Sequence, residues 1–143
     1  MRANPNFDEI RQLLENSRTV AVVGLSGRPR RPSHGVGSAL QGFGYRIFPV
    51  NPNLEGPVLG EEPYSSLTDI EERIDIVDVF RRGEEVMPIA REAVDIGAKA
   101  LWLQLGVINE EAATHASEHG LTVVMDRCIK VDHARFARGG VEE

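Results

Sequence analysis

The chain has 143 residues, the usual size of one domain. Hydrophobic residues make up 41% and charged residues 27%, a globular composition that excludes wholesale disorder. Sixteen basic and twenty-two acidic residues give a net charge of −6, which argues against nucleic acid or an anionic membrane as a partner. No apolar run is long enough to cross a bilayer, and the N-terminal residues lack the apolar core of a signal peptide. We therefore expect a cytoplasmic single domain over residues 1–143, with its core at about residues 7–135.

Helices and buried strands are predicted to alternate along the chain. The first helix precedes the first strand, with Phe7, Ile10, Leu13 and Leu14 on one stripe. Five apolar runs predict strands at Thr19–Leu25, Tyr45–Val50, Ile74–Phe80, Ala100–Leu105 and Leu121–Met125. Their hydrophobicity is nearly continuous rather than alternating, which is typical of parallel strands that are covered on both faces.

Apolar residues at helical spacing lie between these strands. The helices are marked by Val36, Ala39, Leu40 and Phe43 after the expected N-cap Ser33; by Val86, Ile89, Ala90, Ala93 and Val94 before Gly97; and by Ala112, Ala113 and Ala116 between the cap Asn109 and Gly120. This order predicts a Rossmann-like, doubly wound α/β fold with a mainly parallel sheet and helices on both faces. We also expect a short edge strand at Pro57–Leu59 and a frayed, flexible tail after His133 that contains Gly139 and Gly140.

The segment after the first strand has the composition of an anion site. Gly24 and Gly27 allow tight turns, and three arginines occur within four positions of an otherwise acidic chain: Arg28, Arg30 and Arg31. The next helix is expected to begin with unpaired N–H groups at Ser33, Gly35 and Val36. Because a helix start of this kind favours negative charge, the loop predicts a phosphate-containing ligand.

The absence of two common motifs narrows the class of phosphate-containing ligand. Neither the G-x-G-x-x-G loop and ribose-binding acid of an NAD site nor the Walker A loop of an NTPase is present. After the second strand, Asn51 and Pro52 offer an amide and a flat apolar surface to an adenosine. Arg81 and Arg82 follow the third strand and suit a further phosphate, although pairing with nearby glutamates is an alternative, especially for Arg82.

Five stretches of sequence resemble one family in the same order along the chain. They are Thr19–Ser26, Gly44–Asn53, Ile74–Arg81, Ala100–Gly106 and Val124–Lys130. They resemble the single-domain CoA-binding proteins, which are similar to the N-terminal CoA-binding domain of the succinyl-CoA synthetase α subunit. The resemblance spans roughly Phe7 to Arg135.

This resemblance implies coenzyme A lying across the strand ends. It implies pyrophosphate and 3′-phosphate contacts for the loop with Gly24, Leu25, Ser26, Arg31, Ser33, His34 and Gly35. It also implies adenosine contacts from Pro49, Val50, Asn51 and Pro52, closure by Phe80 and Arg81, and a pantetheine arm along Gln104 and Gly106. The extra ribose phosphate of CoA explains why arginines stand where an NAD site has an acid.

The sequence predicts less about the roles of Cys128 and the histidines than about the loop after the first strand. The four histidines form no triad, and His115, His119 and His133 are expected at the surface. Cys128 is the only cysteine, so it has no intrachain disulfide partner, and no zinc-ligand spacing is present. It is either a small buried hydrophobe or, because Arg127 and Lys130 are near in sequence, a reactive thiolate that forms a mixed disulfide with CoA.

Three functions are compatible with these patterns. The leading hypothesis is a non-catalytic CoA or acyl-CoA carrier or sensor, because no catalytic constellation is visible. The alternatives are an enzyme, either a subunit of a split acyl-CoA synthetase or an NAD(P)-binding oxidoreductase, and a scaffold that binds nothing. A homodimer or an unidentified protein partner is compatible with each of them.

Overall fold

The sheet of this protein consists of five parallel strands. The computed structural model describes residues 4–137, and the strands are β1 (Thr19–Val23), β2 (Arg46–Val50), β3 (Ile76–Val79), β4 (Ala100–Leu103) and β5 (Thr122–Met125). Their spatial order is β2-β1-β3-β4-β5, and every neighbouring pair is parallel. The predicted strands and the Rossmann-like, doubly wound α/β class are confirmed.

The strand order creates a switch point between β1 and β3. The chain leaves β1 towards β2 on one side and later returns to β3 on the other side. The strand ends are in register, because Val23 pairs with both Val50 and Val79, and Leu103 pairs with both Val79 and Met125. The segments that follow all five strands therefore leave the same carboxyl edge, where ligands bind in open α/β sheets.

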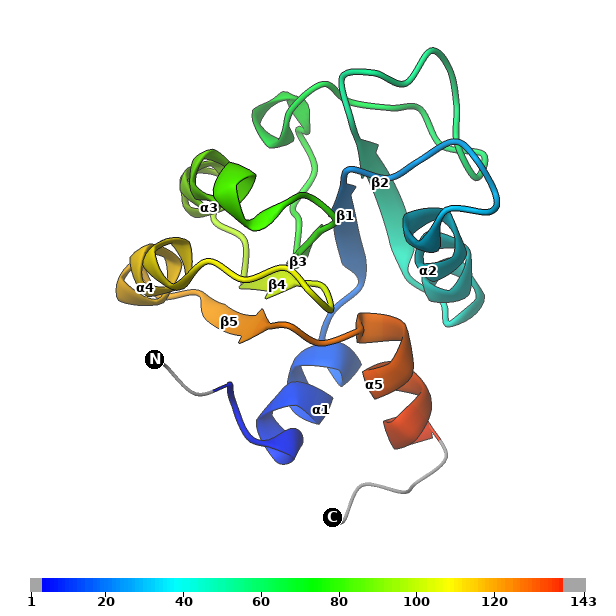
Figure 1. The fold of residues 1–143 in the computed structure, drawn as a ribbon. Coiled ribbons are helices and arrows are strands. Elements are labelled where there is room, and N and C mark those ends of the chain that lie inside the picture. Colours follow the sequence, from blue (N-terminus) through cyan, green and yellow to red (C-terminus); the bar gives the residue numbers. More distant parts are fainter. Residues whose placement is uncertain (1–3, 138–143) are drawn as a thin grey trace.

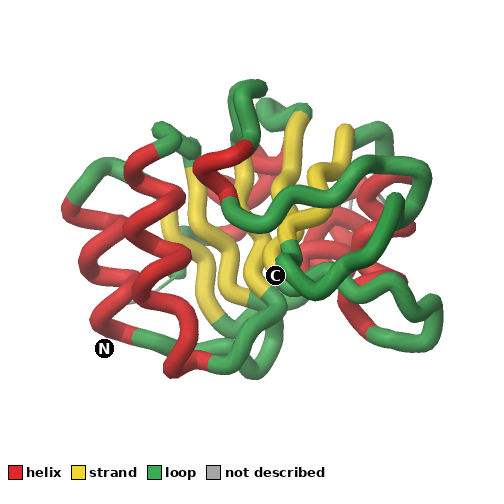
Figure 2. Tube along the Cα trace, turned by 90° about the horizontal axis from the view of Figure 1, so that it is seen from above, coloured by secondary structure: helices red, strands yellow, loops and turns green. Residues whose placement is uncertain are grey.

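Helices cover both faces of the sheet, as the strands' continuous hydrophobicity predicts. The helices are α1 (Phe7–Glu15), α2 (Pro32–Gly42), α3 (Val86–Asp95), α4 (Glu110–Glu118) and α5 (Ile129–Ala137), with short 3-10 turns η1 (Leu67–Asp69) and η2 (Gly83–Glu85). Figure 1 shows α3 and α4 together on one side and α1, α2 and α5 on the other, and Figure 2 shows the strands between the helical layers.

Side chains of each strand alternate between two separate cores. Val22 and Trp102 face α1, α2 and α5, whereas Ala21, Val77 and Leu101 face α3 and α4. All five are fully buried. Since both faces of the sheet exclude water, each strand needs apolar residues at nearly every position.

The start of α2 differs from the prediction. Pro32 is the first helical residue and Arg31 is the N-cap, without a side-chain capping bond, so Ser33 is not the cap. Proline is favoured at this position because its missing N–H would be unpaired there in any case. The predicted cap of α4 is confirmed, since the Asn109 side chain accepts a hydrogen bond from the N–H of Ala112 at 2.9 Å.

Two terminal and edge predictions are wrong in detail. The chain after His133 continues as α5 up to Ala137, whereas Gly139 and Gly140 lie outside the described residues. Pro57–Leu59 does not join the sheet: Val58 forms only an isolated antiparallel bridge with Glu61, and Tyr64 pairs with the edge of β2 instead. Gly60, with φ of +79°, turns the chain there and keeps the strand short.

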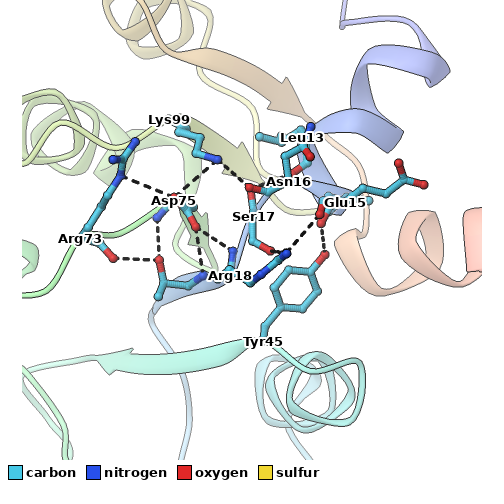
Figure 3. Close-up of polar contacts among 11 residues, drawn as sticks. Leu13, Glu15, Asn16, Ser17, Arg18, Tyr45, Arg73, Asp75 and Lys99 are labelled. Carbon is cyan, nitrogen blue, oxygen red and sulfur yellow. Dashed lines mark hydrogen bonds and ion pairs between the residues drawn. The ribbon is translucent and has the colours of Figure 1, made fainter.

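A polar cluster fastens the amino edge of the sheet. Figure 3 shows the Asp75 carboxylate between Arg18, Arg73 and Lys99. It accepts a 2.7 Å hydrogen bond from the Arg18 backbone N–H and lies 3.7 Å from the Lys99 ammonium and 3.8 Å from the Arg73 guanidinium. Lys99 also donates to the carbonyl of Asn16 at 2.7 Å. The cluster therefore connects the end of α1 with the starts of three strands, far from the carboxyl edge.

None of the helices in the described part of the chain combines the length and the apolar character that spanning a membrane requires.

Candidate ligand site at the carboxyl edge

Three strands converge on Gly24 at the switch point. Its N–H donates to the Val50 carbonyl at 2.8 Å, and the Phe80 N–H donates to the Val23 carbonyl at 2.8 Å. A Cβ at Gly24 would lie 2.4 Å from the Phe80 carbonyl oxygen, and the backbone φ is +88°. Only glycine fits both conditions, so the loop after β1 can turn directly over the end of β3.

The β1–α2 loop is built on two serines. The Ser33 hydroxyl accepts from the Ser26 N–H at 2.9 Å, and the Ser26 hydroxyl accepts from the Arg28 N–H at 3.1 Å. The N–H groups of Leu25, Gly27 and Ser33 have no acceptor among the residues that the structure describes. These donors, together with the start of α2, leave the loop short of hydrogen-bond acceptors, which an anion supplies.

The prediction for the N–H groups of Gly35 and Val36 is wrong. The Gly35 N–H bonds to the Arg31 carbonyl at 3.3 Å, and Val36 lies deeper in the helix with its side chain buried. The reason is the early start at Pro32, which shifts the free donors towards Ser33. His34 lies half-buried in the first turn, and its N–H bonds to the same Arg31 carbonyl at 3.1 Å.

The loop arginines are available to a ligand. Arg28, Arg30 and Arg31 are exposed, and none of them has a carboxylate partner in the described chain. The chain as a whole has a net charge of −6, so three guanidinium groups without an ion pair on one loop are a local concentration of positive charge. They make this loop a cationic surface, which we name the cationic loop (residues 24–35).

The two arginines after β3 have different surroundings. Arg82 pairs with Glu85 at 2.9 Å and Glu84 at 3.6 Å, so the alternative of local pairing applies to it. Hydrogen bonding to Arg82 lowers the pKa of Glu85. Arg81 is half-buried and forms no close ion pair in the described residues, although its charge also lowers the pKa of Glu85; its Cδ lies 3.5 Å from the position that a Gly24 Cβ would take. Arg81 therefore passes over the switch point and adjoins the cationic loop, as does half-buried Phe80.

The segment after β2 is used mainly to hold the loops together. The Asn51 side chain donates to the Leu25 carbonyl at 3.1 Å and accepts from the Asn53 N–H at 3.0 Å. One donor and one acceptor position of its amide are therefore used by the protein, and the predicted contact with the adenosine stays a prediction. Pro49 and Val50 are buried inside β2, so Pro52 alone of the predicted adenosine contacts is exposed. The side chain of Leu25 is also fully buried, which leaves only its backbone for a ligand.

The segments after β4 and β5 are fastened to each other. Gln104 is 4% exposed, and its side-chain oxygen accepts from the Ile129 N–H at 3.0 Å, at the start of α5. The side-chain oxygen of Gln104 thus supports a helix, and the predicted contact of Gln104 with the pantetheine arm stays a prediction. The exposed Gly106 donates its N–H to Asp126 at 2.7 Å.

Cys128 lies half-buried at the same edge. It packs against the core under α1, α2 and α5. The Arg127 guanidinium, one of the two charges that motivate a reactive thiolate, is held by Asp132 through two 2.7 Å hydrogen bonds. The packing favours the hydrophobic interpretation, whereas the mixed disulfide with CoA stays a prediction.

The histidines do not join the site, apart from His34. His119 is exposed, and its ring lies 4.5 Å from that of half-buried His115 on α4. His133 is half-buried, as His115 is, so both are less exposed than predicted; His133 stacks on Phe43 at 4.0 Å. Burial lowers the pKa of His133. This contact exists because α5 continues past His133 and packs against α2.

Sequence reasoning missed three residues near the edge. Leu105 and Ile108 are apolar but 70% and 51% exposed. Asp78 is fully buried in β3 without a hydrogen-bond partner for either carboxylate oxygen in the described chain, and desolvation raises its pKa well above the ordinary range. The available signal was an acid inside an otherwise apolar strand run.

A separate cavity of about 600 Å³ lies at the opposite end of the sheet. It is lined by residues of α1 and the start of β5, among them Gln12, Asn16 and Thr122, together with Lys99. Lys99 is already bonded to Asn16 and Asp75. The cavity does not contain the unpaired cationic groups of the carboxyl edge.

Comparison with known proteins assigns this arrangement to a family. A family described as a CoA binding domain matches residues 18–134. The chain belongs to this family. The CoA binding domain is 49% identical over 131 residues to the Uncharacterized protein YneT of Bacillus subtilis (strain 168), covering 92% of this chain and 96% of that protein.

Solved structures share the architecture. The structure of cell-free ID.343 from Thermus thermophilus matches with a TM-score of 0.88 and 39% identity, over 92% of this chain and 98% of that chain. An acetyl-coenzyme A synthetase from Ca. Korarchaeum cryptofilum matches with a TM-score of 0.69 and 20% identity. That match covers 82% of this chain but 27% of the synthetase chain, and it shows the fold alone.

Proposed function

We propose that this CoA binding domain is a binding module for coenzyme A, with the phosphates held by the cationic loop. The observation that carries the proposal is the set of unpaired cations and donors around Gly24. Arg28, Arg30, Arg31 and Arg81 have no carboxylate partner in the described chain, and free N–H groups lie between them. A molecule with a pyrophosphate and a separate ribose phosphate matches several cations better than one phosphate does.

We assign the parts of CoA by the order of the strands. The phosphates lie over the β1–β3 switch point, where the Arg81 side chain reaches Gly24 and the loop that carries Arg31 begins. The adenosine lies towards β2 beside the exposed Pro52, and the pantetheine arm extends over β3 towards Gly106 after β4. This direction follows from β1 being between β2 and β3 in the sheet.

The first test compares CoA with dephospho-CoA and NAD⁺ in a thermal unfolding experiment. A ligand that binds only the native state stabilises it by about 2.7 kcal/mol at a hundredfold excess over its Kd. We expect CoA to raise the Tm more than dephospho-CoA, with NAD⁺ having little effect, because the 3′-phosphate adds a charge-assisted contact. Equal Tm shifts for CoA and dephospho-CoA would mean that the arginines do not bind the 3′-phosphate.

Substitutions of single arginines test where CoA binds. Arg31→Ala and Arg81→Ala should each weaken CoA binding by about 10- to 150-fold, equivalent to about 1.5–3 kcal/mol for a charged hydrogen bond. Arg91→Ala is the matched control, since Arg91 is exposed on α3, which packs on the opposite face of the sheet from α2. If the Arg91 substitution weakens binding as much as the other two, only overall charge matters and the assigned site is wrong.

The same titration separates the enzymatic alternative on this fold. If the protein is an NAD(P)-binding oxidoreductase, NAD⁺ or NADP⁺ should raise its Tm at least as much as CoA does. A larger shift with NADP⁺ than with CoA would favour that alternative, because NADP⁺ also carries an extra ribose phosphate.

A further inference from the structure

Two apolar side chains are exposed on one loop at the carboxyl edge. Leu105 is 70% exposed and Ile108 is 51% exposed, both on the loop between β4 and α4. The other large apolar side chains that are exposed in the described chain are Phe43, which follows the end of α2, and Val131 in the first turn of α5. We name the Leu105 and Ile108 pair the apolar lip.

The lip is exposed although its loop is firmly held. The Gly106 N–H donates to Asp126 at 2.7 Å, the Val107 N–H donates to the Gln104 carbonyl at 2.8 Å, and the Val107 side chain is buried. The Asn109 side chain donates to the Gly83 carbonyl at 2.8 Å. Hydrogen bonds hold the backbone on both sides of the lip. The exposure of these two side chains is therefore a feature of the ordered loop.

The lip adjoins the segment that carries Arg81. A Cβ at Gly83 would lie 2.3 Å from the Ile108 carbonyl oxygen, so the loops after β3 and β4 are in direct backbone contact. The cationic loop starts from β1, two strands away from β4. Two strand spacings are about 10 Å, a distance that the pantetheine arm of CoA spans.

The charge beside the lip restricts what can cover it. Asp126 is exposed, and its carboxylate is bonded to Gly106, the residue after Leu105. A terminal carboxylate on a ligand would meet this negative charge, whereas a hydrocarbon chain would gain the burial of two aliphatic side chains.

We propose that the apolar lip holds the hydrocarbon chain of an acyl-CoA thioester, so that the natural ligand is a neutral, aliphatic acyl-CoA. The inference rests on the proposed CoA site, because the lip alone does not choose an occupant. Its position beyond the pantetheine arm makes the acyl chain the part of the molecule that reaches it, and Asp126 disfavours dicarboxylic acyl groups such as a succinyl group.

The test measures Kd values for CoA and for S-ethyl-, S-butyl- and S-hexyl-CoA, thioethers that cannot be hydrolysed. We expect the affinity of the wild type to rise about two- to fourfold for each added methylene that reaches the lip. S-carboxypropyl-CoA should bind more weakly than S-butyl-CoA. The double variant Leu105→Ser, Ile108→Ser should keep the Kd for CoA but lose the gain with chain length. Val131→Ser is the matched control, since it removes a 55% exposed apolar side chain from α5 and should keep the gain.

Each other result overturns a defined part of the proposal. If CoA itself does not bind, the proposed function fails and the lip inference fails with it. If CoA binds but the Kd is independent of chain length, or the gain survives the double substitution, only the lip inference fails. Weaker binding of CoA itself by the double variant would show that the lip contacts pantetheine. A dimer in sedimentation that the double substitution dissociates would show that a second copy covers the lip.

Discussion

Arg81 and Arg82 show how much the surroundings of a single residue decide. They are neighbours in sequence with the same side chain, yet Arg82 is paired with two glutamates and Arg81 lies over Gly24 without a carboxylate partner in the described chain. The sequence predicted a cationic pair after β3 and allowed local pairing for either residue. Which of the two is free depends on the turn of η2, which brings Glu85 next to Arg82.

Asp78 is the residue whose environment is least favourable. It stands between Val22 and Trp102 in the sheet, and both of its oxygens lack partners in the described chain. The indole N–H of Trp102 does not help, because it donates to the Arg127 carbonyl at 2.8 Å. A carboxyl group in such a place is held in its neutral form, because ionisation would bury an uncompensated charge.

Asp78 should therefore make the protein less stable as the pH rises. Its folded pKa is raised, so between the ordinary carboxyl pKa of 3.8 and the folded value the native state binds more protons than the unfolded state. The free energy of unfolding then falls by up to about 1.4 kcal/mol per pH unit in this window. Asp78→Asn, which is neutral at every pH, should lack this decline in urea unfolding measured from pH 4 to 9. Parallel profiles for Asp78→Asn and wild type would contradict the assignment, and Asp69→Asn, an exposed acid, is the control.

At the scale of whole elements, helix α5 depends on contacts that lie far apart in sequence. Its first N–H is bonded to Gln104, and Asp132, which is 2% exposed, pairs with Arg127. Ile129 and Phe136 are at helical spacing in the sequence. However, the segment that contains them is short and is followed by two glycines, a pattern that predicts a frayed tail. The helix forms because tertiary contacts supply what local propensity does not.

The amino-edge cluster should contribute stability that is lost in acid. Burial by itself would raise the pKa of Asp75, but the N–H groups of Arg18 and Thr19 and the charges of Lys99 and Arg73 lower it overall. Its contribution is therefore complete above the unfolded pKa and is lost as the pH falls through the lower, folded pKa. At pH 7, Asp75→Asn should reduce the free energy of unfolding by about 1–3 kcal/mol. Asp95→Asn, at the exposed end of α3, should change it little. A loss for Asp75→Asn that is unchanged at pH 3 would contradict the ionic role.

For the whole molecule, the distribution of charge differs from its sum. The net charge of −6 repels a polyanion at long range, whereas the cationic loop attracts it at contact. We expect the affinity for CoA to fall by roughly 3- to 10-fold between 0.05 and 0.5 M NaCl, because added salt screens exposed charges. Arg31→Ala should show a weaker salt dependence. A Kd that is constant over this range would mean that the loop does not bind phosphates through its charges.

The sequence alone determined much of what is known of the fold of this protein. The five strands, the helices between them, the fold class and the cationic loop after β1 follow from hydrophobic periodicity, turn residues and local charge, which are properties of short segments. Sequence resemblance also identified the CoA-binding family before the site geometry was known.

Only the tertiary structure decided which residues at the carboxyl edge are free. Asn51, Gln104 and Arg82 have the chemistry of ligand contacts, but each is engaged by a neighbouring loop, helix or turn. Leu105 and Ile108 have the chemistry of core residues, yet they are exposed because the loop around them is fastened elsewhere. Partnership and exposure depend on segments that meet only after folding, and for that reason no pattern along the chain could assign them.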